Sequence, residues 1–235
     1  YTLMVFLISI LLGLSMGSGT VFSLQYGAGR MKALRRSIYV SAVLIGTVTI
    51  VLNIAALSFI HPILKLLQIP DDIYQMMYDY LWIIFWGIGF TFIYNFYAAL
   101  LRAIGNAVTP LYFLAISVVL NIGLDLFFIL LLDWGIKGAA IATIIAQGVS
   151  ALGIMGYTYA KCPELRLHRN DLHFDRHCLK EITSFSTLTC IQQSVMNLGI
   201  LMVQGLVNSF GSMVMAAFAA AIKIDSFAYM PVQEF

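Results

Sequence analysis

Charged side chains are scarce in this sequence, which has 13 Lys or Arg and 11 Asp or Glu among its 235 residues. They make up 10% of the chain, whereas a soluble globular domain carries about 25%. A chain with 61% hydrophobic residues and a mean hydropathy of +0.92 cannot cover itself with polar surface. The composition excludes an ordinary water-soluble domain and predicts an all-α membrane protein, a polytopic helical bundle.

Cysteine is also scarce, and the three residues Cys162, Cys178 and Cys190 form no spaced framework, so we expect free thiols. The sequence lacks a GxSxG, HExxH, Walker A or GxGxxG motif in a fitting context, so we expect no enzyme and no cofactor. Without a Walker A motif, an ion gradient is the power source that we expect for any transport. No signal peptide is visible, and the chain begins and ends within apolar runs, which predicts an internal fragment of a longer polytopic protein.

Seven apolar runs are long enough to cross a bilayer, since a spanning helix needs about 20 residues. They cover residues 1–24, 37–60, 80–101, 111–132, 138–160, 188–210 and 213–235. The first six runs contain a single charged residue, Asp125. Its isolation makes Asp125 the first candidate for a functional role.

The basic residues give the orientation of these helices. Ten Lys and Arg residues lie in the connections after the first, third and fifth runs, and two, Lys65 and Lys137, lie in those after the second and fourth. Because cytoplasmic loops are rich in Lys and Arg, loops 25–36, 102–110 and 161–181 are predicted to be cytoplasmic. The ten residues are Arg30, Lys32, Arg35, Arg36, Arg102, Lys161, Arg166, Arg169, Arg176 and Lys180.

Asp125 needs polar partners, because a carboxylate at the centre of a bilayer costs about 2.5–3.5 kcal/mol. Ser117, Asn121 and Asp125 are spaced four residues apart, so they share one face of a helix. The next run carries a matching stripe of Thr143, Gln147 and Ser150, and the short connection predicts antiparallel neighbours. Asp125 and Thr143 lie at similar depth, so we expect a hard-oxygen site that suits Na⁺ or a proton.

Two further features favour an aqueous cavity. Gln193, Asn197, Gln204 and Asn208 are spaced by 4, 7 and 4 residues, which places four amides within one narrow arc of a helix. Lys223 lies near the middle of the last run, so it faces a cavity or pairs with another segment. Gln147, Gln193, Asn197, Gln204 and Lys223 are therefore candidate cavity-lining residues, although polar residues in membrane helices often only bond a neighbouring helix.

Small residues mark positions where helices can approach each other closely. Gly13 and Gly17 have the four-residue spacing of such contacts. Gly148, Gly153 and Gly156 leave three positions of the fifth run without a side chain, which allows tight packing or bending of that helix.

Several motifs, in this order, resemble the MATE (multidrug and toxic compound extrusion) family. They are QYGAGR at 25–30, LRAIGNAVTPLYF at 101–113, NIGLD at 121–125, GIKGAAIATIIAQG at 135–148 and NSFGSMVMAAFAAAIKID at 208–225. The resemblance implies a twelve-helix transporter built from two bundles of six helices, of which this chain would hold the second to the eighth. Residues 1–160 would form the first bundle without its first helix, 161–181 the cytoplasmic linker, and 182–235 the first two helices of the second bundle.

The same resemblance implies a function and a site. The family exports drugs or organic-cation-like metabolites in exchange for H⁺ or Na⁺. Its cation site corresponds here to Asn121, Asp125 and Thr143, with a backbone carbonyl near Ala139. The acidic residue that some members carry early in the second bundle is replaced by Gln192 and Gln193, so we place the ion in the first bundle.

From these points we expect an integral protein of the bacterial inner (plasma) membrane that is monomeric at full length. Its expected partners are membrane lipid and a small lipophilic or cationic substrate, not nucleic acid. Two alternatives remain open at this point. A flippase for a lipid-linked precursor or polysaccharide shares the two-bundle architecture, and a seven-helix receptor matches the number of predicted spans.

Overall fold

The computed structural model describes residues 2–66, 71–167, 175–208 and 221. This part of the chain is helical, with no strand in it. Five helical segments are long and apolar enough to cross a membrane: Ile8–Gly27, Met31–Ser58, Tyr74–Ala103, Val108–Leu131 and Gly135–Lys161. They confirm the first five predicted spans, and the polytopic all-α fold with them. The predicted run 213–235 lies outside the described residues.

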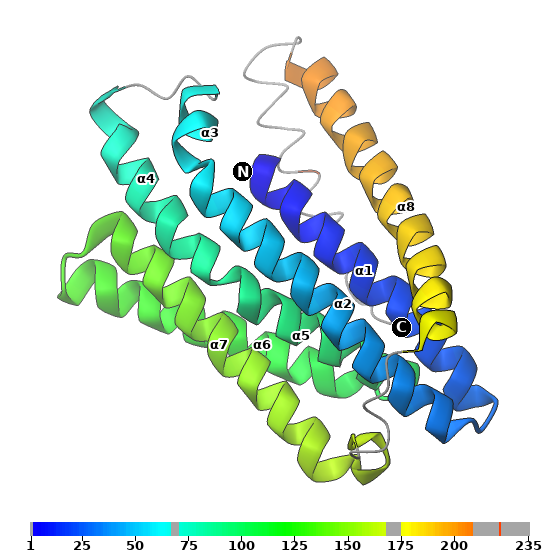
Figure 1. Cartoon of the computed structure of the whole chain (residues 1–235). Coiled ribbons are helices and arrows are strands. Elements are labelled where there is room, and N and C mark those ends of the chain that lie inside the picture. Colours follow the sequence, from blue (N-terminus) through cyan, green and yellow to red (C-terminus); the bar gives the residue numbers. More distant parts are fainter. Residues whose placement is uncertain (1, 67–70, 168–174, 209–220, 222–235) are drawn as a thin grey trace.

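The helices in chain order are α1 (Thr2–Gly27), α2 (Met31–Ser58), α3 (Ile60–Leu66), α4 (Asp71–Trp86), α5 (Ile88–Ala103), α6 (Val108–Leu126), α7 (Gly135–Lys161) and α8 (Arg176–Asn208). A π-helical turn, η1 (Phe127–Leu131), continues α6, and a short 3-10 helix, η2 (Pro163–Leu165), follows α7. Helix α1 packs against α2, α5 and α8, and α7 packs against α4, α5 and α6 (Figure 1).

The core lies between α1, α2, α4, α5 and α7. Phe22 and Phe85 are fully buried there, and the rings of Phe22 and Phe96 meet edge to face with their centroids 6.0 Å apart. By contrast, the outer face of α6 and of the η1 turn after it is exposed, with Val119 of α6 and Leu130 of η1 more than 70% accessible. In a membrane protein such an apolar face suits contact with lipid or with another helix.

The third predicted span is broken in the middle. The sequence predicts one helix over 80–101, whereas the structure has α4 and α5 separated at Gly87. A Cβ atom at position 87 would lie 3.1 Å from Gln147 Oε1 and 3.2 Å from Ile144 Cγ1 of α7. A side chain at position 87 would crowd α7, so the close approach of α7 favours glycine at the junction of α4 and α5.

Helix α8 begins earlier than predicted. The sequence places a span at 188–210 and a linker at 161–181, but the helix already starts at Arg176. Asp175 explains the difference: its Oδ1 accepts the backbone N–H of His177 at 2.8 Å, as a helix-capping carboxylate does. This hydrogen bond lowers the pKa of Asp175. Residues 176–181 of the predicted linker are therefore helical.

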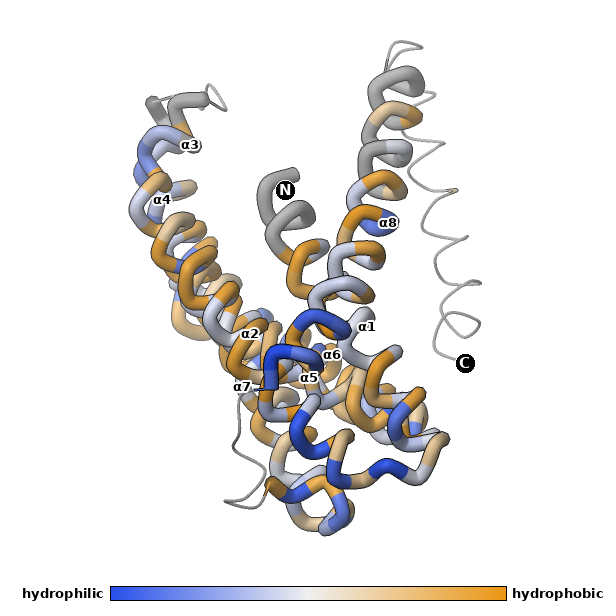
Figure 2. The backbone as a smooth tube through the Cα atoms, turned by 45° about the vertical axis from the view of Figure 1, so that its right-hand side comes forward, coloured by the Kyte–Doolittle hydropathy of each residue, from blue (hydrophilic) through white to orange (hydrophobic). Residues whose placement is uncertain are grey.

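The loops rich in Lys and Arg gather at one end of the molecule. Arg35 of α2 and Glu164 after α7 are joined there by a hydrogen bond of 3.4 Å from the Arg35 guanidinium to the Glu164 carbonyl. Hydrophilic residues collect at the same end (Figure 2). At the opposite end, Lys137 at the start of α7 forms an ion pair of 2.8 Å with Asp79 of α4. We refer to these as the basic end and the far end.

Helices α1 and α8 touch through small residues near the basic end. Added Cβ atoms would lie 2.8 Å from Cys190 Cα at Gly13 and would collide with Ser186 Cα at Gly17. Ser186 Oγ donates to the carbonyl of Leu14 at 3.2 Å across the same contact. The predicted role of the two glycines in close helix approach is confirmed.

Towards the far end, the two sides of the molecule separate. Helices α3 and α4 lie on one side and the C-terminal end of α8 on the other, so that the described helices form a V (Figure 2). The α1–α8 contact near the basic end, which we call the glycine seam (Gly13, Gly17, Ser186 and Cys190), lies towards its closed end.

The glycine seam leads to a prediction about the stability of a Gly17 variant. Gly17→Ala should lower the free energy of unfolding of the complete gene product by about 1–3 kcal/mol, because the new methyl group meets the α8 backbone and the helices must move apart. Thermal unfolding in detergent measures the change. Gly156→Ala is the matched control, since nothing lies within 4 Å of an added Cβ there. Equal stability of both variants would contradict the seam.

Candidate functional site

Helices α6 and α7 bring three of the predicted site residues together. The side-chain amide of Asn121 donates to Thr143 Oγ1 at 3.4 Å, and Thr143 Oγ1 donates to the carbonyl oxygen of Ala139 at 2.9 Å. The second bond is local, because a threonine within a helix readily bonds the carbonyl four residues earlier. Asn121 of α6 is thereby tied to the first part of α7.

Asp125 lies one helical turn after Asn121, on the same face of α6. Its side chain is half-buried, and its Oδ1 atom is sealed from solvent without a hydrogen-bond partner among the described residues. A buried acceptor of this kind is costly, all the more so when it belongs to a carboxylate. Asp125 Oδ1 therefore needs a proton, a cation or water.

The turn that follows Asp125 is unusual. Residues Phe127–Leu131 form a π-helix, which is rare and often occurs at functional sites. The ring of Phe128 then stacks on Trp134 with centroids 5.2 Å apart, and a Cβ atom at Gly138 would lie 2.9 Å from Phe128 Cβ. Asp133 has a φ of 52°, in the left-handed region that Asp tolerates better than most residues. The α6–α7 turn is thus closely packed beside the polar cluster.

A second polar contact joins α5 to α7. Thr91 Oγ1 lies 3.4 Å from Gln147 Oε1, at the break beside Gly87. Thr91 and Gln147 line two pockets, one of about 40 Å³ that reaches Leu11 of α1 and one of about 190 Å³ that reaches Ser117 of α6. Both are large enough for water. Of the residues in this contact, the sequence predicted Gln147 but not Thr91.

Ser150 completes the polar stripe that the sequence predicts on this helix. Its Oγ donates to the carbonyl of Phe113 at 2.9 Å, so it fastens α7 to α6. Thr143, Gln147 and Ser150 therefore all face neighbouring helices of the bundle. A signal for Thr91 did exist in the sequence: Thr91 and Asn95 are four residues apart in an apolar run, and Asn95 Nδ2 donates to the Thr91 carbonyl at 2.8 Å.

The amide stripe of the sixth run is only partly described. Gln193 lies on α8 and is half-buried. The side chains of Asn197 and Gln204 and the whole of Lys223 lie outside the described residues. A role of these residues in lining a cavity stays a prediction.

The α6–α7 cluster offers oxygen atoms as possible ligands. Asn121 Oδ1, Thr143 Oγ1 and the Ala139 carbonyl supply neutral oxygens, and Asp125 supplies the negative charge. Such hard oxygen donors suit H⁺ or an alkali cation better than a soft transition metal. Within the described residues, no group of three or more His, Cys, Asp or Glu side chains is placed to hold a metal ion.

Comparison with known proteins gives concordant matches. The sequence model of the MatE family matches residues 1–127, which is more than half of the chain. A probable multidrug resistance protein of Bacillus subtilis, YpnP, is 32% identical over 231 residues, covering 98% of this chain and 51% of the relative. The probable multidrug resistance protein NorM of Thermotoga maritima is 28% identical, covering 94% of this chain and 48% of the relative.

Solved structures agree in fold. The crystal structure of MATE in complex with MaL6 superposes with a TM-score of 0.91 at 20% identity, covering 99% of this chain and 52% of the other. The Vibrio cholerae MATE transporter VcmN in its bent form gives a TM-score of 0.85 at 26% identity, covering 98% and 52%. The chain spans about half the length of the curated relatives and structures that it matches.

The unpaired carboxylate makes a testable prediction. Asp125→Asn should stabilise the complete gene product in ion-free detergent at neutral pH, by up to about 2.5 kcal/mol, because the variant removes a buried charge that the fold does not compensate. Thermal unfolding provides the measurement. Asp133→Asn is the matched control, because Asp133 is exposed and Asn also tolerates its φ. A less stable Asp125→Asn protein would show that the carboxylate has a structural partner.

Proposed function

Since this chain belongs to the MatE family, the MATE transporters that its motifs resemble, we propose that it forms the ion-binding part of a secondary active antiporter. The antiporter exports drugs or organic-cation-like metabolites in exchange for H⁺ or Na⁺. The family is one of transporters, so the seven-helix receptor is the wrong alternative, and we expect no catalytic role of this chain. The resistance proteins of Bacillus and Thermotoga favour drug export over the flippase.

One observation carries the proposal: Asp125 Oδ1 is buried and has no hydrogen-bond partner in the part of the chain that the structure describes, one turn from the Asn121–Thr143–Ala139 cluster. A structural carboxylate would have a partner, because an uncompensated charge in a bilayer is expensive. A coupling site has to be empty for part of each cycle. Asp125, Asn121, Thr143 and the Ala139 carbonyl are the proposed ligands.

The proposed orientation places the basic end in the cytoplasm. Loops 25–36, 102–110 and 161–181 are then cytoplasmic, and the far end faces outward. The homologues from Bacillus and Thermotoga favour the bacterial plasma membrane as the location. In this orientation α4 and the C-terminal part of α8 diverge towards the outside (Figure 2), while α1 and α8 are in close contact at the glycine seam nearer the cytoplasmic side.

The proposed mechanism begins with this outward-open arrangement. A proton or Na⁺ reaches Asp125 and neutralises it, which removes the penalty for enclosing the side chain between α6 and α7. The bundle then repacks, the π-helical turn after Asp125 provides a place where α6 can bend, and the glycine seam separates. The substrate, a lipophilic or cationic small molecule, binds between the bundles. We expect the full-length protein to work as a monomer within the lipid bilayer.

The first functional test is Asp125→Asn in the complete gene product. Everted membrane vesicles that carry this variant should lose ion-driven accumulation of a lipophilic cationic dye, because the neutral side chain no longer changes charge when the ion binds. Asp133→Asn, the exposed aspartate close by, should transport normally. Comparing imposed Na⁺ and pH gradients in the unmodified protein identifies the coupling ion. Undiminished transport by Asp125→Asn would overturn the assignment.

The second test addresses Thr143, whose hydroxyl accepts from Asn121. Thr143→Val keeps the shape of the side chain but removes the oxygen, so the ion concentration for half-maximal transport should rise about 10–100-fold. Thr143→Ser retains the hydroxyl and should stay close to the unmodified protein. Concentration series of the coupling ion measure the effect. Identical values for Val and Ser would remove Thr143 from the site.

A further inference from the structure

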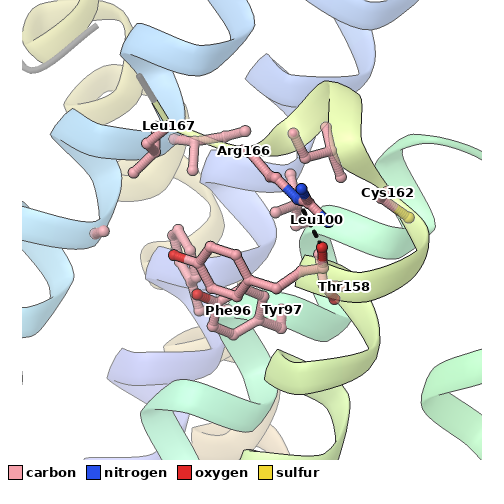
Figure 3. A pocket seen from close by; sticks show the side chains of 11 residues that line it. Phe96, Tyr97, Leu100, Thr158, Cys162, Arg166 and Leu167 are labelled. Carbon is pink, nitrogen blue, oxygen red and sulfur yellow. Dashed lines mark hydrogen bonds between the residues drawn. The ribbon is translucent and has the colours of Figure 1, made fainter. Parts of the chain in front are cut away.

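A separate pocket of about 150 Å³ lies at the basic end, distant in the fold from the α6–α7 cluster (Figure 3). Its walls come from α2, α5 and α7, and the segment after α7 covers it. Phe96 and Leu100 of α5 line the pocket on one side. Thr158 and Tyr159 of α7, Cys162 directly after α7, and Arg166 line it on the other.

The floor of the pocket is buried and largely apolar, and Tyr97 and Tyr159 also line the pocket. Phe96, Leu100 and Cys162 are each at most 7% exposed, and Thr158 turns its hydroxyl away to the Ile154 carbonyl at 2.8 Å. Burial, followed by the negative charge of Glu164, raises the pKa of the Cys162 thiol, which agrees with a site of poor access to water. A cavity of this size lined by apolar side chains binds a group about as large as benzene.

The mouth of the pocket is cationic. Arg166 is exposed, and its Nε donates to the carbonyl of Tyr159 at 2.8 Å, which fixes the guanidinium over the entrance (Figure 3). Among the described residues no bond to its two terminal NH₂ groups is present, and the fork of arginine is well suited to an anion. Lys161 and Glu164, an exposed base and an exposed acid, are close to Arg166 in the sequence but do not line the pocket.

The apolar and cationic parts are arranged along the membrane normal. Phe96 lies two turns before the end of α5, whereas Arg166 lies beyond the end of α7. Since α5 and α7 both end at the basic end, the apolar floor is the deeper part and the guanidinium lies at the surface. An amphiphile in the adjacent leaflet has the same order, with its chain inward and its headgroup at the interface.

We propose that this pocket is a binding site for an anionic phospholipid of the cytoplasmic leaflet, with part of an acyl chain among Phe96, Leu100 and Cys162 and the phosphate on Arg166. The choice of leaflet rests on the orientation proposed above, whereas the lipid class rests on the pocket alone. Basic pockets between membrane helices on the cytoplasmic side bind acidic headgroups in this manner. The bound lipid connects α2, α5 and α7 with the start of the linker to α8.

Cys162 is a built-in reporter for this proposal. The complete gene product is reconstituted in vesicles of dioleoyl phosphatidylcholine, with or without dioleoyl phosphatidylglycerol, and alkylated with N-ethylmaleimide. Peptide mass spectrometry follows each cysteine separately, so no cysteine has to be replaced. Cys162 should react about five-fold more slowly when phosphatidylglycerol is present. This factor corresponds to the preference for an anionic headgroup that one basic residue confers. Cys178 is the internal control, because it is also 7% exposed but lies outside the pocket.

Arginine variants make the test specific. Arg166→Gln should abolish the difference between the two lipids, and Arg36→Gln, which removes an exposed base outside the pocket, should preserve it. Equal rates in both lipids, slowing of Cys178 to the same degree, or persistence of the effect in Arg166→Gln would each overturn the proposal. Protection by oleic acid but not by phosphatidylglycerol would also do so. None of these outcomes depends on Asp125, so failure of the lipid proposal can be distinguished from failure of the antiporter assignment.

Discussion

The cost of a charge in hydrocarbon is the constraint on which this structure depends. A membrane helix satisfies its own backbone, but it cannot satisfy a carboxylate, and each polar side chain has to find a partner on a neighbouring helix. Along α7 that is what Thr143, Gln147 and Ser150 do, through Asn121, Thr91 and the Phe113 carbonyl respectively. Asp125 Oδ1 departs from this pattern within the described residues. The nearby Asn121, Thr143 and Ala139 carbonyl are polar but uncharged, so they do not neutralise the charge of the carboxylate.

Close packing of small residues is the second requirement, since apolar side chains gain little from leaving lipid for protein. Gly87 lets α7 approach the break between α4 and α5, Gly138 makes room for Phe128, and Gly17 lets α1 touch the backbone of α8. These contacts involve no charge, so they form and separate without desolvation of an ion. A contact between moving parts benefits from this property.

The sequence predicts those features that depend on residues close together in the chain, and it misses those that depend on residues far apart. Five membrane spans, the antiparallel α6–α7 pair and the Asn121–Thr143 contact were predictable, because they depend on hydropathy and helical spacing alone. The close packing of α7 on Gly87 was not, because it depends on a helix far away in the sequence. The early start of α8 was missed because the apolar run begins later than the helix, although Asp175 carried a capping signal. Thr91 was missed because one threonine in an apolar helix is commonplace, and its significance lies in facing Gln147.

In the proposed antiporter, the ion site and the glycine seam have to communicate through packing. Asp125 lies on α6, on the far-end side of the bundle, whereas Gly17 and Ser186 lie towards the basic end, and the seam has no charged residue that senses the ion directly. A continuous route of contacts nevertheless exists: α7 holds α6 through Ser150, Gln147 meets Thr91 of α5, and Phe96 of α5 packs on Phe22 of α1. Each step joins rigid helices. Movement of the α6–α7 pair on ion binding therefore shifts α1, and the tight fit of Gly17 against α8 makes the seam sensitive to a small displacement of that helix.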